Sequence, residues 1–439
     1  MAFTHSPYVL SPVLQKKWFL HPSRPRPTSP ALLATMLWCV ARTADSPIFH
    51  LPGSRRDMDN WRRVRGWQLE EDSATSLDTD RLGKSRRTFS TGPTPCVDDV
   101  LTFLLLTIVI SGGEYKSDCI KWWNKTVGLI KHLRLHKEPS MSRQSQGFAE
   151  EHEERRRVFW LAYTMDSHLA LSHNRPLDIL DAECEVFNPL PDNLWQTFDT
   201  LGMEALQLRT YGPPMTISGT GFFEYSLPMM AILGGIIDFR LRRYHPLLVS
   251  NDDAFLELIK ANLTCCERSI CELSDTQSLS RSPSGTWLQR STAKMVVAYA
   301  VHIIKVLYVL VYGNWDAITM FEDDGDWITS SSRPELSFMS YLFGIYLLHG
   351  SFVLLLFAER MSRVGPNPSV EEACEVIIRA HEVAIVTLNT EFQPIFRKEF
   401  RSRLYNARRS ELSEAELETL RKEVLSTYRS TMGRRGLCL

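Results

Sequence analysis

The sequence predicts an all-α protein, built as one large multi-helix domain. Several segments repeat apolar residues at the three- and four-residue spacing of a helix, and some begin with residues typical of helix N-termini. No stretch shows the sustained alternation of apolar and polar residues that a half-buried strand would need. The 439 residues are 44% hydrophobic and 23% charged, close to globular averages, so the chain can bury a large core.

The first predicted helix follows a segment in which prolines alternate with other residues. Ser29 and Pro30 stand where an N-cap and a first helical residue belong. The run Ala31–Thr43 is then expected to be helical, because it is apolar and ends shortly before Ser46 and Pro47.

The composition divides the chain into three parts. Residues 1–52 are expected to form the N-terminal part of the domain, and residues 97–439 its helical core and C-terminal arm. Between them, residues 53–96 mix Gly, Ser, Thr and Asp with many arginines, a composition typical of a polar loop.

Two helices are predicted to open the core as an antiparallel pair. Asp98 and Asp99 precede a strongly apolar run, where acidic residues complement the helix dipole. Residues 121–135 then repeat apolar positions at helical spacing.

Further helices are expected along the rest of the chain. Residues 211–235, which are rich in Gly and Pro, are expected to be a loop leading into a helix, and residues 295–312 to be a mostly apolar helix. Capping boxes, Ser369 with Glu372 and Ser413 with Glu416, predict two helices near the C-terminus.

One apolar segment has two possible interpretations. Residues 336–358 contain no Asp, Glu, Lys or Arg over a length that could cross a bilayer. Serines, glycines and a histidine interrupt the run, however, and both flanks mix acidic and basic residues. We favour a buried helix, with a membrane-anchored protein built around residues 101–113, 295–312 and 336–358 as the alternative.

Composition and motifs exclude several classes of function. A net charge of −1 gives no general attraction for nucleic acid, and the nine cysteines, odd in number, are typical of reduced thiols in an intracellular protein. Cys265, Cys266 and Cys271 lack the spacing of a zinc site, and neither His-Glu pair has the second histidine of a zinc protease. No catalytic serine elbow is present either, so we predict neither a metal site nor an enzyme.

The most informative segment is residues 150–195. Glu150 to Glu154 are expected to start a helix, where their charge would suit the exposed backbone N–H groups. Residues 158–171 are apolar almost all round, which is typical of a central buried helix, and Asp166 is the only acid among them. A buried carboxylate needs a partner, and Arg175 in the following turn could provide one. The alternative is that Asp166 faces a solvated groove and Arg175 caps nearby carbonyls.

The run R-R-x-F-W-x-x-Y-x-x-D followed by N-R-P resembles the middle homology, or regulatory, domain of the fungal zinc binuclear cluster transcription factors. Downstream segments such as PLPDNLW (189–195) and NPSVEEACEVIIRAHEVAIVTLNTEF (367–392) resemble the xylanolytic activators of that family. The residues that carry the signature are Arg156, Arg157, Phe159, Trp160, Tyr163, Asp166, Arg175 and Pro176.

This resemblance implies the regulatory region of a nuclear transcription activator. Its targets would be genes for xylan- and cellulose-degrading enzymes, switched on by a pentose-derived signal. DNA promoter elements would be bound only through a six-cysteine zinc cluster of full-length relatives, so zinc is expected there and no cofactor in this chain. Coregulators or a second copy are further candidate partners, and no membrane is expected. An effector pocket is predicted near Trp160, Tyr163, Arg175 and Trp195.

The sequence also departs from this family in three places. We expect the zinc cluster to be absent, residues 53–95 are unlike the relatives, and only TSSSRPE stands between Ile328 and Leu336, where a helix is expected. The alternative function is therefore a truncated competitor that binds coregulators or a full-length regulator without activating genes.

Overall fold

The computed structural model describes residues 13–15, 17, 21–23, 25–43, 94–111, 116–139, 146–173, 175–198, 209–243, 252–279 and 287–312. Every regular element within these residues is a helix, which confirms the all-α prediction. Two isolated β-bridges, Lys137 with Glu185 and Phe187 with Tyr211, hold loops together. The helices predicted after residue 312, the segment 336–358 and most of the polar segment 53–96 lie outside the described residues.

The first described helix, α3 (Pro30–Thr43), begins where the sequence predicts. The Ser29 hydroxyl accepts a hydrogen bond from the Leu32 backbone N–H at 3.1 Å, which is the geometry of an N-cap. Arg26, just before the helix, donates to Asp98 at 2.7 Å and also pairs with Glu154. The N-terminal segment is thereby joined to two later helices.

Helices α5 (Val97–Ser111) and α6 (Lys116–His132) pack side by side, as predicted. α6 starts five residues before the predicted Lys121 and ends three residues before Leu135. Asp98 does not simply complement the dipole of α5, because its carboxylate also accepts from the Ser29 N–H at 2.6 Å. Burial of this acid is balanced by partners from the N-terminal segment.

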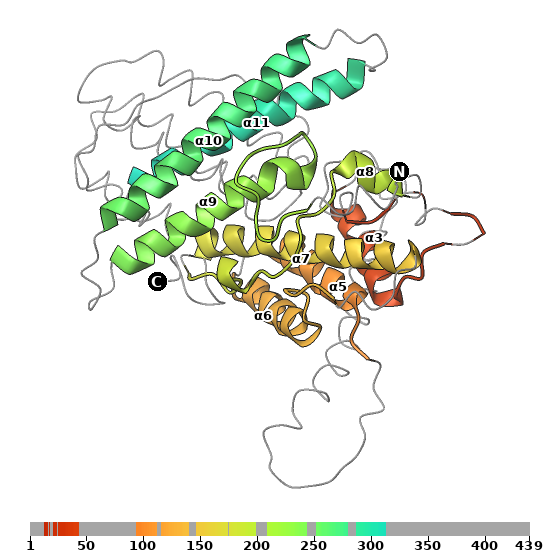
Figure 1. Ribbon diagram of the computed structural model, residues 1–439. Coiled ribbons are helices and arrows are strands. Elements are labelled where there is room, and N and C mark those ends of the chain that lie inside the picture. The colour runs from red at the N-terminus through yellow and green to blue at the C-terminus, as the bar shows by residue number, and fades with distance from the viewer. Residues whose placement is uncertain are drawn as a thin grey trace, which may run out of the picture.

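Helix α7 (Gln146–His173) runs through the middle of the described fold, with α5 on one side and α9 on the other (Figure 1). It starts earlier than the sequence indicates, so Glu150 to Glu154 lie in its second and third turns and its first turn contains no acid. Their predicted role at a helix start is therefore wrong. Glu153 is instead completely buried.

A short 3-10 turn, η3 (Asp181–Glu183), and α8 (Asp192–Gln196) follow α7. The chain then enters α9 (Phe222–Arg243). The loop predicted over residues 211–235 is thus shorter than expected, because α9 begins at Phe222 and continues through Pro228.

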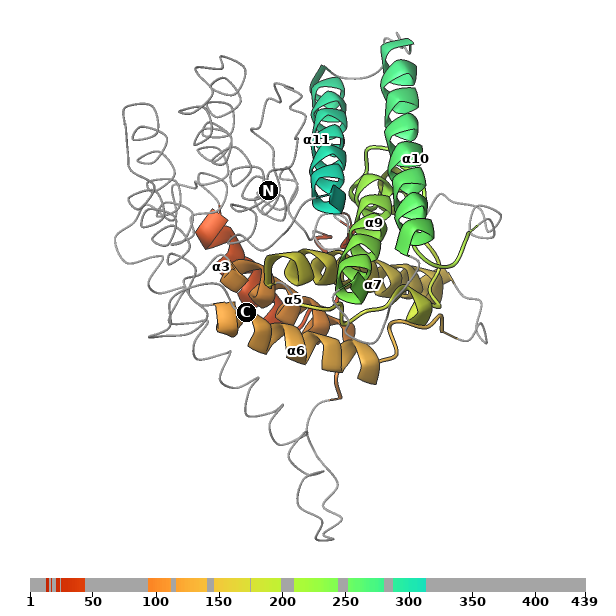
Figure 2. The same ribbon diagram turned by 90° about the vertical axis from the view of Figure 1, so that its left-hand side faces the viewer.

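Helices α9, α10 (Asp252–Leu279) and α11 (Trp287–Tyr312) form a second layer that lies across α7 (Figures 1 and 2). α11 begins eight residues before the predicted Met295. α10 was not predicted, although Ile259, Leu263 and Cys266 are buried at helical spacing on its inner side.

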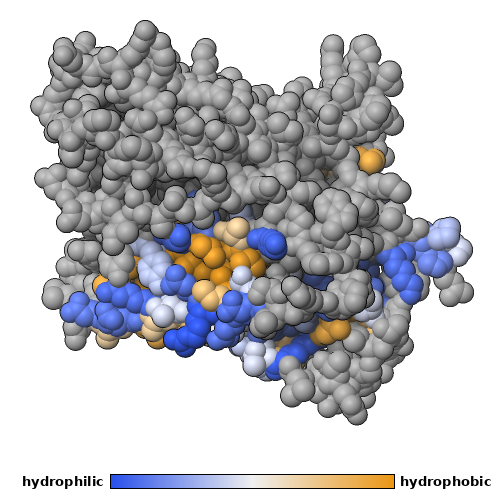
Figure 3. Space-filling model, turned by 90° about the horizontal axis from the view of Figure 1, so that it is seen from above, coloured by the Kyte–Doolittle hydropathy of each residue, from blue (hydrophilic) through white to orange (hydrophobic). Residues whose placement is uncertain are grey.

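Among the described helices, Phe222–Arg242 alone has the length and mean hydropathy of a membrane span, and 78% of its most apolar window is buried in the fold. Such extensive burial is typical of a helix in the core of a folded domain. Figure 3 shows one face of the molecule, where hydrophobic side chains gather in a patch among hydrophilic ones. Among the residues that the structure describes, the exposed large hydrophobic side chains are Leu33, Leu37, Leu180, Tyr211, Met215, Leu241 and Leu258.

Candidate functional site

The predicted ion pair between Asp166 and Arg175 is present. Arg175 Nη2 donates to Asp166 Oδ1 at 2.7 Å, and the backbone N–H groups of Asp178 and Ile179 donate to Asp166 Oδ2 at 2.8 and 2.7 Å. Burial raises the pKa of Asp166 despite the opposing effect of Arg175. The alternative of a solvated groove is excluded, because the Asp166 side chain is only 1% exposed.

Arg175 also fixes the turn that follows α7. Its Nη1 donates to Asp178 Oδ2 at 2.8 Å, and Trp123 Nε1 donates to the same oxygen at 2.7 Å. The guanidinium lies 5.7 Å from the centre of the Trp123 ring. This arrangement joins α6, the end of α7 and the N-R-P turn.

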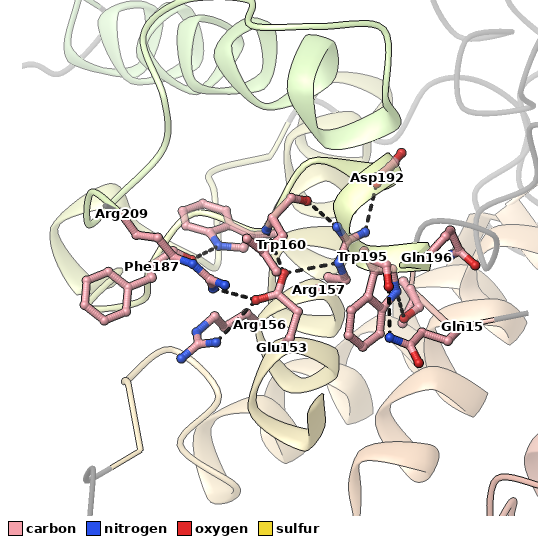
Figure 4. Close-up of polar contacts among 12 residues, drawn as sticks. Gln15, Glu153, Arg156, Arg157, Trp160, Phe187, Asp192, Trp195, Gln196 and Arg209 are labelled. Atoms are coloured by element: carbon pink, nitrogen blue, oxygen red, sulfur yellow. Dashed lines mark hydrogen bonds and ion pairs between the residues drawn. The ribbon is translucent and has the colours of Figure 1, made fainter. Parts of the chain in front are cut away.

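A second and larger group of charges lies near the start of α7 (Figure 4). We call it the Glu153 cluster, and it consists of Glu138, Glu153, Arg156, Arg157, Asp192 and Arg209.

Glu153 is the centre of this cluster. Its carboxylate accepts from Arg209 Nη1 at 2.6 Å, Arg157 Nε at 3.2 Å and the Leu190 N–H at 2.7 Å. Arg156 adds a longer contact of 3.3 Å. Burial on its own would raise the pKa of Glu153, but the three arginines lower it below its ordinary value. Glu153 is therefore held as a buried carboxylate.

The two signature arginines use their other donors differently. Arg156 pairs with Glu138 through Nε at 2.8 Å and also through Nη2, and its guanidinium lies 5.8 Å from the Phe187 ring centre. Arg157 donates to Asp192 Oδ1 at 2.9 Å and to the Leu190 carbonyl. Both arginines therefore hold the loop that follows η3 against α7.

Asp192 extends the cluster to the start of α9. Its Oδ2 accepts from the Phe222 N–H at 2.8 Å, and its own N–H donates to Glu224 at 3.3 Å. A Cβ on Gly221 would lie 2.0 Å from the Glu224 carboxylate, so a larger residue there would displace this side chain. The entry to α9 is thus fixed by the same group of charges.

The aromatic residues of the signature are part of the core. Trp160 Nε1 donates to the Phe187 carbonyl at 2.8 Å, and the Tyr163 hydroxyl donates to Asp181 Oδ1 at 2.6 Å. Burial raises the pKa of Tyr163 well above its ordinary value. Phe159 and Trp160 are completely buried. These side chains hold α7 in place through packing and hydrogen bonds.

The four residues of the predicted effector pocket lie on or beside α7. Trp160 and Tyr163 are in edge-to-face contact with ring centres 5.2 Å apart, and the guanidinium of Arg157 lies 5.1 Å from the centre of the Trp195 ring. Arg175 pairs with Asp166. The polar groups of all four side chains bind other parts of the chain, and the pocket stays a prediction.

The ion pair of Asp166 and Arg175 could be predicted from the sequence, because an acid in an apolar helix needs a positively charged partner when it is buried. Sequence reasoning missed Glu153, which looked like a solvated residue in an acidic and basic run, and Arg209, which lies in no recognisable motif. The signal that could have indicated Glu153 is its i,i+4 spacing to Arg157 at the start of an apolar helix. Within the described residues, no three His, Cys, Asp or Glu side chains are grouped to hold a metal ion.

Residues 66–217 match the family model described as "Fungal specific transcription factor domain", a segment that contains α7 and the Glu153 cluster. This segment is therefore similar to the regulatory domains of the fungal-specific transcription factor family. No solved structure matches the chain.

Over 99% of its length, the chain is 37% identical to the xylanolytic transcriptional activator xlnR of Emericella nidulans and covers 59% of that protein. It is 34% and 33% identical to proteins of the same name from Aspergillus clavatus and Aspergillus niger, of which it covers 56% and 57%. The chain thus spans less than two thirds of the length of these relatives. The alignments run over 542 to 554 positions, so they include positions that a chain of 439 residues does not fill.

Proposed function

We propose that this chain is the regulatory region of a nuclear transcription activator that controls genes for xylan- and cellulose-degrading enzymes in response to a pentose-derived signal. The observation that carries this proposal is the similarity of 99% of the chain to proteins named xylanolytic transcriptional activators. DNA promoter elements would be bound only through the zinc cluster of full-length relatives, where zinc would be the cofactor, and this chain itself would need none. The described helices would transmit the signal.

The geometry supports a role in regulation rather than in chemistry. Charged side chains of the family signature form ion pairs inside the fold, as in Asp166 with Arg175, and in Arg157 with Glu153, which lies just before the signature. Such pairs specify one arrangement of the helices around α7. A regulatory domain needs such a defined arrangement of helices. A signal or a coregulator can then shift the domain from this conformation to another one.

A reporter assay tests this function. The full chain is fused to a heterologous DNA-binding domain in a filamentous fungus that carries the matching reporter gene. We expect reporter activity to rise when D-xylose replaces glucose as the carbon source. The DNA-binding domain alone is the negative control, and the matching region of the Emericella nidulans relative is the positive control. Equal reporter activity on both sugars would contradict the response to pentose, and activity below that of the DNA-binding domain alone would favour the non-activating competitor.

Direct sensing is a separate part of the proposal. If the effector binds near Trp160, Tyr163, Arg175 and Trp195, isothermal titration of the chain with D-xylose or its phosphate should release or absorb heat in a saturable way. Absence of heat with both sugars, together with a positive reporter assay, would place the sensor in another protein.

A further inference from the structure

Arg209 is the least satisfied charged residue of the Glu153 cluster. Its side chain is only 7% exposed, and Nη1 donates to Glu153 Oε2 at 2.6 Å. Nε and Nη2 are buried and have no hydrogen-bond partner. Buried donors in native proteins are almost always paired, because an unpaired one keeps its full desolvation cost.

The two unpartnered nitrogens lie on one edge of the guanidinium. This edge, formed by Nε–H and an Nη–H, is the part of an arginine that binds carboxylates and phosphates through two parallel hydrogen bonds. Arg209 uses its other end for Glu153, as Figure 4 shows. The donors that remain therefore have the geometry for one more oxyanion.

The charges around Arg209 favour an anion as well. Glu138 pairs with Arg156 and Asp192 pairs with Arg157, so Glu153 is the acid that Arg209 contacts. Glu153 is shared among all three arginines. Burial lowers the pKa of Arg209, and Glu153 opposes this effect without cancelling it. A second negative charge would complete the compensation.

The chain next to Arg209 reaches the surface. Thr210 and Tyr211, the next two residues, are exposed, and Tyr211 stacks on Phe187 with ring centres 4.0 Å apart. Asn188 pairs with Thr210 through both its backbone and its side-chain amide, and its Oδ1 is buried without a partner. The segment that follows Arg209 is therefore exposed and is held by contacts with Asn188 and Phe187.

We propose that Arg209 anchors a binding site for a small oxyanion, a carboxylate or a phosphate monoester, held by Nε and Nη2 at the edge of the Glu153 cluster. The ligand would join the 209–211 segment to α7. Because the site needs only this chain, the proposal does not depend on the identity of the genes or of the sugar in the proposed function.

Thermal unfolding of the full chain tests the site. Unfolding curves are recorded at neutral pH with increasing sodium phosphate, and separately sodium acetate, against sodium chloride of equal ionic strength. We expect a saturable rise in Tm of about 2 °C for the oxyanion that binds, since a ligand of the folded state stabilises it by mass action. A rise with phosphate alone identifies a phosphate ester as the ligand class, and a rise with acetate alone identifies a carboxylate.

Two variants assign the effect to Arg209. Arg209→Met should abolish the saturable rise, and Arg209→Lys, which keeps the charge next to Glu153 but lacks the paired edge, should weaken apparent affinity at least tenfold. The exposed Arg268→Met is the matched control and should behave as the wild type. If the methionine variant does not fold, the affinity of the lysine variant alone tests whether Arg209 binds the oxyanion. Equal curves in all three salts for the wild type, or an unchanged rise in both Arg209 variants, would overturn the proposal.

Discussion

The ion pair of Asp166 and Arg175 is expected to contribute to the stability of the fold, because it compensates a buried charge. Asp166 is 1% exposed and depends on Arg175 and two backbone N–H groups. Replacing Arg175 with Met removes the charged partner, and we expect the free energy of unfolding to fall by about 2 kcal/mol. Urea unfolding followed by circular dichroism measures this loss. Arg268→Met, on the exposed side of α10, should leave stability unchanged, and equal stability of the two variants would show that the ion pair does not stabilise the fold.

The contribution of Glu153 to the stability of the fold is predicted to depend on pH. Its pKa in the folded state is below the ordinary value of 4.5, so its ionised form stabilises the fold above that pH. This contribution is lost as the pH falls from about 4.5 through the lower folded-state pKa. Glu153→Gln leaves three arginines with too little negative charge, and we expect it to cost about 3 kcal/mol at pH 7.

The difference between wild type and Glu153→Gln should therefore shrink on acidification. Urea unfolding at pH 7 and at steps down to pH 3.5 follows it. The matched control is Glu257→Gln, whose carboxylate is 69% exposed and should show little difference at any of these pH values. A constant difference between wild type and Glu153→Gln would mean that the pKa of Glu153 is the same in the folded and the unfolded protein.

At the scale of single elements, local signals predicted the helices that begin with clear caps. Ser29 and Pro30 located the start of α3 to the residue, because the cap is formed by neighbours in sequence. The early starts of α6, α7 and α11 were missed because their first residues mix polar and apolar side chains without a clear helical repeat. α10 carries an apolar stripe of Ile259, Leu263 and Cys266, so its sequence contains the signal for a helix.

The N-cap of α3 is predicted to stabilise this helix. Ser29→Ala removes the acceptor for the Leu32 N–H, and we expect a loss of about 1 kcal/mol in unfolding free energy. Ser29 also donates its N–H to Asp98, but alanine keeps that contact. The exposed Ser274→Ala within α10 is the control, and it should be neutral or slightly stabilising. Equal effects of both changes in urea unfolding would show that the cap contributes nothing.

At the scale of the whole molecule, contacts between distant segments could not be predicted from the sequence. Arg175, the partner of Asp166, is only nine residues away, in the loop that follows α7, and it was predicted from the sequence. The partner of Glu153, Arg209, is 56 residues away and the partner of Trp195, Val13, is 182 residues away. No spacing rule relates such positions, since their approach follows from the packing of all the helices between them.

The contact of the N-terminal segment with α8 gives the last prediction. Trp195 Nε1 donates to the Val13 carbonyl at 3.1 Å, and Gln15 Nε2 donates to the Trp195 carbonyl at 2.9 Å. Trp195 also forms a small separate core with Leu190 and Phe198. Because Val13 and Gln15 satisfy polar groups of this core, deleting residues 1–15 should open it locally.

Hydrogen exchange measured by mass spectrometry detects this opening. In the chain that lacks residues 1–15, we expect peptides covering residues 190–198 to exchange at least tenfold faster than in the wild type, while peptides of α5 keep their protection. Deletion of residues 1–12 is the matched control, since it leaves Val13 and Gln15 in place. If both deletions accelerate exchange equally, the stabilising contacts come from residues before Val13. If neither does, α8 is held by contacts that are independent of the N-terminal segment, such as the ion pair of Asp192 with Arg157 and the hydrogen bond of Asp192 with Phe222.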